Sequence, residues 1–389
     1  MPALESGAPV SLEWIRRLIA FPTVSRDSNL ELIQCVRDYL RSFDAEIRLT
    51  HDDERRKANL FATLGARGEP GIVLSGHTDV VPTDEQAWDT HPFAVVERDG
   101  RLYGRGTSDM KSFIAVALAF IPEFMRRGSK TPLHLALSYD EEVGCIGVGR
   151  LIRDLKEAGV RPRACIVGEP TLMRPVIAHK GKKGYRCTVR GLAGHSAYAP
   201  LGVNAVEYAA DAVAFLKGME RRLREQGPYD HAFDIAHTTV HTGIIRGGTA
   251  LNIVPHECVF DFEFRHLPGD DPEHLLWQFK QHVKALEAEM RTVHVPAGFI
   301  IEPLSSIPVL DTGPESEVVG LAQELSGLQE IGKVSFGTEA SQFQIAGIPT
   351  VVCGPGSIEQ AHKPNEYVAL DQIIQCERFM HRLMERICE

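Results

Sequence analysis

Short apolar runs that alternate with amphipathic helical patterns constrain the fold of this chain most strongly. Runs typical of buried strands lie at Leu60–Leu64, Gly71–Ser75, Leu133–Ser138, Ala164–Val167 and Thr350–Cys353. Helical patterns lie before, between and after them, for example at Ser112–Arg127 and Leu370–Cys388. Because strands that alternate with helices pack as a sheet with helices against it, the sequence predicts an α/β fold.

A different pattern interrupts the α/β part of the chain near residue 180. Strand-like segments of alternating polarity here enclose two long amphipathic helices. Their order is Tyr185–Arg190, Val203–Glu225, Thr239–Ile245, Cys258–Phe264, Pro272–Met290 and Val293–Ile301. This β-α-β-β-α-β order is the ferredoxin-like signature. We therefore predict one domain built from residues 1–180 and 295–389, interrupted by an α+β ferredoxin-like domain at 181–294.

Composition excludes several classes of partner. Lys and Arg number 42 against 52 Asp and Glu, giving a net charge of −10, whereas nucleic-acid binders normally carry a basic patch. The longest apolar run, Phe113–Ile121, falls short of the roughly 20 residues that span a membrane. The eight cysteines form no CxxC pair, and Met1–Leu12 lacks the pattern of a secretory signal. We expect a cytoplasmic protein that binds neither nucleic acid nor membranes.

Histidine and carboxylate side chains gather after the predicted strands or in adjoining loops. They are His77, Asp79, Asp109, Glu141, Glu142, Glu169 and His362. Singly, each has an ordinary explanation, such as a satisfied surface histidine or an aspartate in a turn. Together they lie in five segments at strand exits, where open α/β sheets bind ligands, and they are the groups that divalent metals prefer. The sequence therefore predicts a metal site.

Five motifs in a fixed order resemble the M20 family of metallopeptidases and amidohydrolases. They are GHTDVVP, GRGTSDMK, DEEVGCIG, GEPT and GPGSIEQAHKPNE, and the resemblance extends over nearly the whole chain. Within the family, GEPT, the TEA of GTEASQF and GPGSIEQAH are most similar to the acetylornithine deacetylase branch. The resemblance implies a zinc-exopeptidase-like catalytic domain with a mixed sheet, and a lid and dimerisation domain at the insert.

The resemblance also implies a dinuclear centre with two Zn²⁺ ions per subunit, for which Co²⁺ can substitute. Asp109 would bridge both ions. His77 and Glu169 would complete one ion, and Glu142 and His362 would complete the other. The peptide bond that follows Asp109 would be cis, as in related enzymes.

Further catalytic roles follow from the same resemblance. Asp79 would fix the tautomer of the His77 imidazole. Glu141 would act as general base, taking a proton from water and passing it to the leaving amine. His195 of GLAGHSAYAP would reach across a dimer interface to stabilise the oxyanion.

Substrate-binding residues are implied in both domains. Arg265 and Asn252 match family positions that hold the substrate α-carboxylate. The alternative for Arg265 is a surface residue that ends a strand. Glu339 is our candidate for binding a substrate ammonium group. The alternative is a loop residue that caps a helix starting near Ala340. Ser341 and Gln342 depart from the branch pattern in this loop, which leaves the acyl amino acid open.

The resemblance predicts a homodimeric enzyme that binds a small N-acyl amino acid. The expected reaction removes the acetyl group from N-acetyl-L-ornithine and gives L-ornithine and acetate, a step of arginine biosynthesis. One alternative keeps the chemistry on another N-acyl amino acid, an N-succinyl diamino acid or a dipeptide. Another is a catalytically silent binding protein, which the complete set of metal-centre residues disfavours.

Overall fold

The computed structural model describes residues 8–388, which form two compact units. The first unit contains the chain up to Ala178, Asp311–Gly332 and the chain from Thr338 onward. The second contains His179–Leu310 and Lys333–Gly337. The second unit therefore includes the predicted insert, 181–294, and also takes residues 295–310. Residues 1–7 lie outside the described residues. They belong to Met1–Leu12, the segment whose lack of a signal pattern contributed to the predicted cytoplasmic location.

A mixed sheet forms the centre of the first unit, which confirms the predicted α/β fold. Its order is β1-β2-β6-β3-β7-β17-β8-β15, and β16 pairs with β8. Strands β6, β3, β7 and β17 run parallel, while β1, β2 and β8 pair antiparallel to their neighbours. The strands are β1 (Glu46–His51), β2 (Ala58–Leu64), β3 (Ile72–His77), β6 (Leu133–Ser138), β7 (Ala164–Pro170), β8 (Val176–His179), β15 (Leu310–Asp311), β16 (Gly332–Val334) and β17 (Thr350–Gly354).

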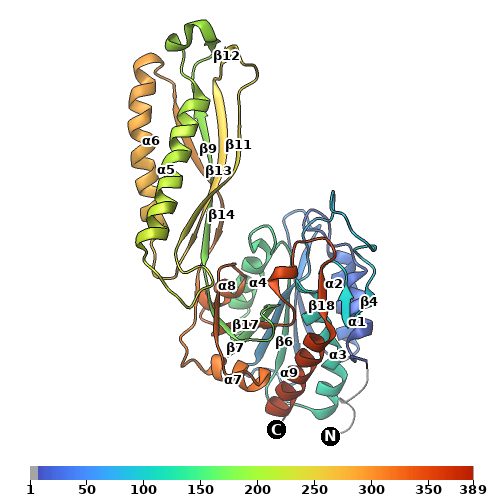
Figure 1. The fold of residues 1–389 in the computed structure, drawn as a ribbon. Coiled ribbons are helices and arrows are strands. Elements are labelled where there is room, and N and C mark those ends of the chain that lie inside the picture. Colours follow the sequence, from blue (N-terminus) through green and yellow to red (C-terminus); the bar gives the residue numbers. More distant parts are fainter. Residues whose placement is uncertain (1–7, 389) are drawn as a thin grey trace. The chain divides into compact units, whose positions relative to one another are not determined.

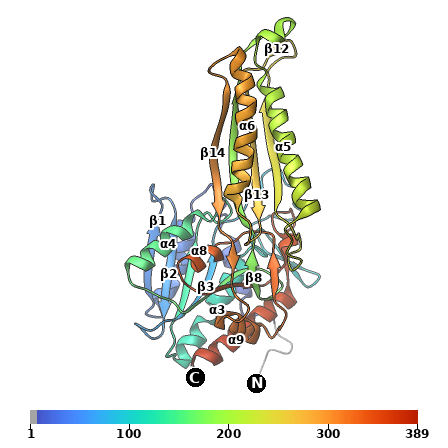
Figure 2. The same ribbon diagram turned by 90° about the vertical axis from the view of Figure 1, so that its left-hand side faces the viewer.

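Helices cover both faces of this sheet (Figures 1 and 2). One face carries α1 (Leu12–Ile19), α2 (Leu30–Arg41), α3 (Lys111–Arg127), α7 (Glu317–Ser326) and α9 (Leu370–Cys388). The other carries α4 (Ile146–Glu157) and α8 (Ala340–Ile345). Strand β6 shows the alternation behind this arrangement: Leu135 and Leu137 join the core under α3, while Ser138 bonds to the residue before α8.

Two local features tie the C-terminal segment to the rest of the first unit. Ser11 directly precedes α1, but its hydroxyl donates to Glu377 in α9 at 2.7 Å instead of capping its own helix. A small sheet with the order β18-β5-β4 joins Tyr367–Ala369 to Arg101–Tyr103 and Val96–Arg98. The segment after the short helix η2 (Ile358–Gln360) is thereby fixed beside the segment that leads into α3.

The second unit has the predicted ferredoxin-like arrangement (Figure 1). Strands β9 (Gly181–Arg190), β11 (Thr239–Gly247), β13 (Glu257–His266) and β14 (Gly298–Ile307) form an antiparallel sheet in the order β11-β13-β9-β14. Helices α5 (Ala205–Gln226) and α6 (Pro272–Val293) pack on one face. In β13, Phe260, Phe262 and Phe264 face these helices, so the alternate residues lie on the uncovered face.

A short antiparallel ribbon extends the second unit beyond its main sheet. It pairs β10 (Gly194–His195) with β12 (Ile253–Val254) and leads into the helix η1 (Ser196–Leu201). Within the described residues of both units, no helix is long and apolar enough to cross a membrane.

Candidate metal centre

The seven residues predicted for the metal centre come together in the first unit. Strands β3, β6 and β7 are parallel, so their carboxyl ends meet at one edge of the sheet. His77 ends β3, Glu169 lies near the end of β7, and Glu141 and Glu142 follow β6. Asp109 lies just before α3, and His362 follows η2. The peptide bond after Asp109 is cis, as predicted.

The carboxylate of Asp109 lies between the two histidines. Its Oδ1 is 2.9 Å from His77 Nε2, which is also 3.5 Å from Glu169 Oε1. Its Oδ2 is 3.3 Å from His362 Nε2, which is also 2.9 Å from Glu142 Oε2. Each oxygen of Asp109 thus faces one histidine and one further carboxylate, the arrangement that a bridging ligand of two metal ions requires.

The donor set fits a dinuclear metal site. One ligand atom from each of His77, Asp109 and Glu142 lies within 4.8 Å of the other two, and the same holds for His77, Glu141 and Glu169. Imidazole and carboxylate are suitable ligands for Zn²⁺ and related transition metals. Several buried carboxylates facing two imidazoles also leave an excess of negative charge, which bound cations would neutralise.

The pKa values reflect this concentration of buried acids. Burial raises the pKa of Glu141 to about 8 and that of Glu142 to about 7. Burial alone would also raise the pKa of Asp109, but its hydrogen bonds with His362 and His77 outweigh that effect and lower it. Hydrogen bonds to Asp109 and Glu142 raise the pKa of His362 to about 10. Burial and the neighbouring acids thus favour bound protons on Glu141, Glu142 and His362.

The backbone carbonyl and the carboxylate of Asp79 have different hydrogen-bond partners. Its carbonyl oxygen lies 2.9 Å from His77 Nδ1, whereas its carboxylate is 3.7 Å away. The carboxylate accepts from Ser25 Oγ at 2.7 Å and from the backbone N–H groups of Glu141 and Glu142 at 3.1 and 3.3 Å. Asp79 therefore contacts the His77 ring through its carbonyl, and its side chain holds the turn that carries the two glutamates.

A buried ion pair that the sequence did not reveal joins two of the ligand loops. Glu366 accepts hydrogen bonds from the backbone of Gly106, Ser108 and Asp109 and from Arg105 Nη1 at 2.7 Å. Arg105 also donates to the carbonyl of Lys363, and both charged side chains are about 1% exposed. Glu366 ends the HKPNE segment that contains His362, so this pair fixes the Asp109 and His362 loops against each other. The motif contained the glutamate, but nothing in its spacing indicated Arg105 as its partner.

Glu339 lies in the same unit but away from solvent. It is fully buried, and its two carboxylate oxygens accept from Ser75 Oγ at 2.7 Å and Ser138 Oγ at 2.6 Å. It directly precedes α8 without capping that helix through its side chain. This geometry argues against the predicted binding of a substrate ammonium group.

The remaining predicted residues lie in the second unit, at two ends of its sheet. The imidazole of His195, in β10, is exposed, and its Nδ1 accepts from Ala197 N at 3.1 Å. The backbone carbonyl of Asn252, which precedes β12, accepts from Ser196 in the same ribbon. Arg265, near the other end of β13, donates from Nε to Glu263 at 2.8 Å.

Arg265 and the ribbon are far apart in one chain. The ribbon connects to the start of β13 at Glu257, whereas Arg265 pairs with Lys182 near its end. At about 3.3 Å per residue, the intervening strand spans roughly 26 Å. The predicted cooperation of Asn252 with Arg265 therefore cannot occur within a single second unit.

Comparisons with known proteins identify the family. The chain matches peptidase family M20/M25/M40 over residues 73–386. It is 38% identical to an acetylornithine deacetylase from Myxococcus xanthus, with 96% of both chains covered. It is 34% identical to an acetylornithine deacetylase from Pasteurella multocida, with 98% of both chains covered.

Solved structures show the same fold at low identity. The aminopeptidase PepT from Bacillus cereus superposes with a TM-score of 0.74 at 19% identity, covering 97% of this chain and 98% of its own. The Bacillus subtilis protein YXEP, described as a dinuclear metal binding peptidase from the M20 family, gives 0.62 at 15% identity with 96% of both chains covered. The family match and the acetylornithine deacetylase relatives, together with the Asp109 cluster, show that the chain is a metal-dependent hydrolase of peptidase family M20/M25/M40.

Proposed function

We propose that this hydrolase removes the acetyl group from N-acetyl-L-ornithine to give L-ornithine and acetate, a step of arginine biosynthesis. The observation that carries the chemistry is the carboxylate of Asp109 lying between His77 and His362. The acetylornithine deacetylases that match nearly the full chain at 34–38% identity support the substrate. We also propose a cytoplasmic location, since all eight cysteines, which lie within the described residues, are free thiols.

The first unit supplies the base for the reaction. We propose two Zn²⁺ ions, replaceable by Co²⁺, which when bound would polarise the amide carbonyl and lower the pKa of water. His77, Glu169, Glu142 and His362 would hold them, with Asp109 between them. Glu141 takes the proton from the attacking water and delivers it to the leaving amine. One carboxylate oxygen of Glu141 lies within 4.8 Å of a ligand atom of His77 and of one of Glu169, so the base adjoins the proposed metal site.

The second unit supplies groups for substrate binding and for the oxyanion. We propose that Arg265 binds the substrate α-carboxylate, which would compete with Glu263 for the guanidinium. His195 Nδ1 accepts a backbone hydrogen bond, so the neutral ring carries its proton on Nε2. Nε2–H is then a ready donor for the oxyanion that forms as the amide is attacked.

We propose a homodimer that forms through the second unit. Since Arg265 and the His195 ribbon lie roughly 26 Å apart along β13, an acyl amino acid cannot contact both within one unit. A second copy that contributes its His195 and Asn252 resolves this conflict. Strand β11 is an edge of the sheet, and Ile244 and Ile245 on it are about half exposed. Exposed apolar residues on an edge strand are typical of a pairing surface.

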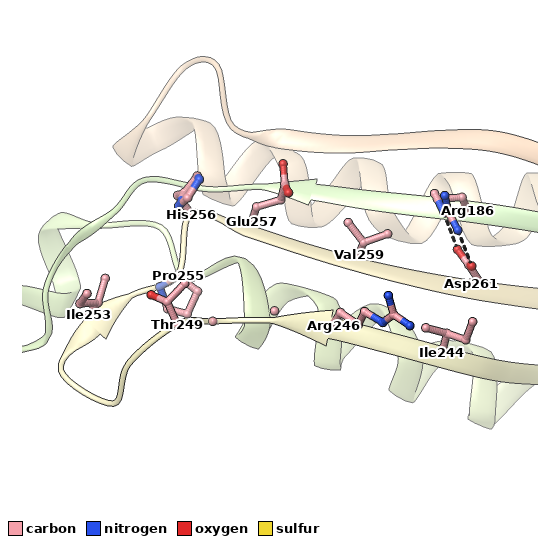
Figure 3. A pocket seen from close by; sticks show the side chains of 12 residues that line it. Arg186, Ile244, Arg246, Thr249, Ile253, Pro255, His256, Glu257, Val259 and Asp261 are labelled. Atoms are coloured by element: carbon pink, nitrogen blue, oxygen red, sulfur yellow. Dashed lines mark hydrogen bonds and ion pairs between the residues drawn. The ribbon is translucent and has the colours of Figure 1, made fainter. Parts of the chain in front are cut away.

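A cavity on the uncovered face of this sheet adjoins the same edge (Figure 3). It has a volume of about 500 Å³ and is lined by residues of β11, β13 and β9, including Ile244, Arg246 and Val259. Its wall contains the paired side chains of Arg186 and Asp261, 2.8 Å apart. None of the predicted metal ligands lines this cavity, so we assign it to the surface and not to the reaction centre.

Light scattering tests the dimer: wild type should give twice the subunit mass, and Ile244→Asp should give a monomer.

A kinetic screen tests the proposed reaction. The metal-loaded enzyme is assayed for acetate or amine release from N-acetylornithine, N-acetylmethionine, an N-succinyl diamino acid and a dipeptide. We expect the highest kcat/KM with N-acetylornithine and no turnover after removal of metal with a chelator. A higher kcat/KM for another substrate would refute the substrate and keep the chemistry. No hydrolysis of any substrate, with two metal ions bound by elemental analysis, would favour a silent binding protein.

A further inference from the structure

The turn that carries the proposed base folds back on itself. The backbone N–H groups of Gly144 and Cys145 both donate to the carbonyl of Glu141, at 2.9 and 2.8 Å. Cys145 adopts φ 55°, in the left-handed region that favours glycine, and then starts α4. A side chain at this position therefore has a backbone cost.

The side chain of Cys145 contacts the proposed base itself. The thiol of Cys145 lies 3.1 Å from Oε1 of Glu141, and Cys145 is 2% exposed. Burial raises the pKa of this thiol well above its usual value, so the sulfur keeps its proton and can donate it to the carboxylate. The terminal torsion of a glutamate is otherwise broad, and a hydrogen bond to one oxygen restricts it. The thiol therefore limits the orientation of the Glu141 carboxylate.

A second side chain holds Cys145 from the opposite direction. Nε2 of Gln342, in α8, donates to the backbone carbonyl of Cys145 at 2.7 Å. The start of α8 is itself fixed to β3 and β6, because Glu339 bonds to Ser75 and Ser138. The turn is thus held by Asp79 at its first residues and by Gln342 at its last.

We propose that Cys145 is a positioning residue for Glu141 and that Gln342 keeps Cys145 in place. The thiol orients the carboxylate for proton transfer without touching the substrate. The inference rests on the proposed role of Glu141 as the general base. It predicts an effect on turnover with little effect on substrate binding or on metal binding.

The first experiment compares two substitutions of the same side chain. Cys145→Ala removes the donor, and Cys145→Ser keeps a donor of similar size. Cys376→Ala is the matched control, since Cys376 is an equally buried free thiol in α9. Each variant is assayed for kcat, KM and bound metal with the best substrate from the screen.

We expect Cys145→Ala to lower kcat about tenfold, the scale of one hydrogen bond to a charged group. KM should stay within about twofold of wild type, a shift too small to count as a lost binding contact, and two metal ions should remain bound. Cys145→Ser and the control should keep most of the activity. Wild-type kcat in Cys145→Ala would overturn the proposal. So would equal losses in the Ala and Ser variants, because these would indicate a packing role.

The second experiment tests the partnership with Gln342. Gln342→Leu should lower kcat in the same direction as Cys145→Ala, and the double variant should be no worse than Cys145→Ala alone. Gln344→Leu is the matched control, because Gln344 lies in the same helix but bonds to Asp311 and Thr312. Additive losses, or equal losses in the two glutamine variants, would overturn the role of Gln342.

Glu141→Gln, assayed in parallel, separates failure of this inference from failure of the proposed function. If Glu141→Gln keeps its turnover, the proposed base is wrong, and the inference falls with it. If Glu141→Gln is inactive while both cysteine variants keep wild-type kcat, Glu141 remains the base and the inference alone is wrong.

Discussion

The metal centre and the second unit hold their functional side chains in different ways. In the metal centre, the partners are buried and distant in sequence: Glu366 holds the loop of Asp109, and Asp79 holds the turn of Glu141. In the second unit, His195 bonds to Ala197 and Arg265 bonds to Glu263, each two residues away. The first region is therefore organised by long-range contacts of the fold, whereas the contacts of the second are local.

The difference separates two kinds of mutational effect. Side chains of the metal centre support both the chemistry and the packing around them, so a substitution there can lower stability as well as activity. Side chains of the second unit are exposed or lie at strand ends, so their removal should lower activity while the fold persists.

Glu141→Gln should have the largest effect on activity. It keeps the shape of the side chain and removes the base, so kcat should fall by roughly 10²–10⁴ while metal content stays near normal. Its neighbour provides the control: Glu142→Gln should weaken one metal site, which elemental analysis after dialysis would detect. Wild-type kcat in Glu141→Gln would place the base elsewhere.

Glu366→Gln should have the largest effect on stability. The substitution leaves the charge of Arg105 buried without its partner, which typically costs about 3–5 kcal/mol. Chemical denaturation would measure the loss in free energy of unfolding, and metal affinity should fall because the two ligand loops are no longer fixed. Unchanged stability would mean that the buried ion pair does not set the geometry of the centre.

His195→Ala should lower kcat by about 10²–10³, the usual effect of losing an oxyanion donor. Because the imidazole is exposed and bonds locally, the melting temperature should not change. Differential scanning fluorimetry and steady-state kinetics on the same preparation would test both parts. A lower melting temperature in step with the lost activity would make His195 structural and would remove the contrast between the regions.

Glu339→Gln should give the smallest of these effects and distinguish two roles. The buried contacts with Ser75 and Ser138 predict a loss of about 1.5–3 kcal/mol in the free energy of unfolding. Any loss in kcat/KM should be equal for N-acetylornithine and N-acetylmethionine. Measuring both substrates with one enzyme preparation cancels errors in active fraction. A loss confined to N-acetylornithine would restore the ammonium-binding role predicted from the sequence.

Much of the fold could be predicted from local patterns in the sequence, whereas the convergence of the metal ligands was predicted from the motifs that resemble the M20 family. Apolar runs such as Leu133–Ser138 identify buried strands, and parallel strands deliver the residues that follow them to one edge. The ferredoxin-like order was equally visible, because its strands alternate in polarity along their length. The C-terminal limit of this unit could not be predicted from the sequence. Strand β14 continues to Ile307 through an irregular register at Pro303–Ser305.

The contacts that hold the ligands could not be predicted, because they depend on which loops the fold brings together. Arg105 and Glu366 are separated by 261 residues. The contact of Cys145 with Glu141 could not be predicted, because a single cysteine at the start of a helix is usually a small buried apolar residue. Glu339 was assigned to the substrate because the sequence does not show that Ser75 and Ser138 on neighbouring strands would face it.

The place of β17 in the sheet affects how the chain is made. Strands β7 and β8 are consecutive in sequence, yet β17 lies between them. During synthesis, the segment up to Leu310 leaves the ribosome before β17, so most of the second unit can fold while β7 still has an open edge. An open, apolar edge of this kind needs protection from pairing with other nascent chains. His362 and Glu366 emerge later still, so we expect the enzyme to acquire its metal ions after translation, when nearly the whole chain is complete.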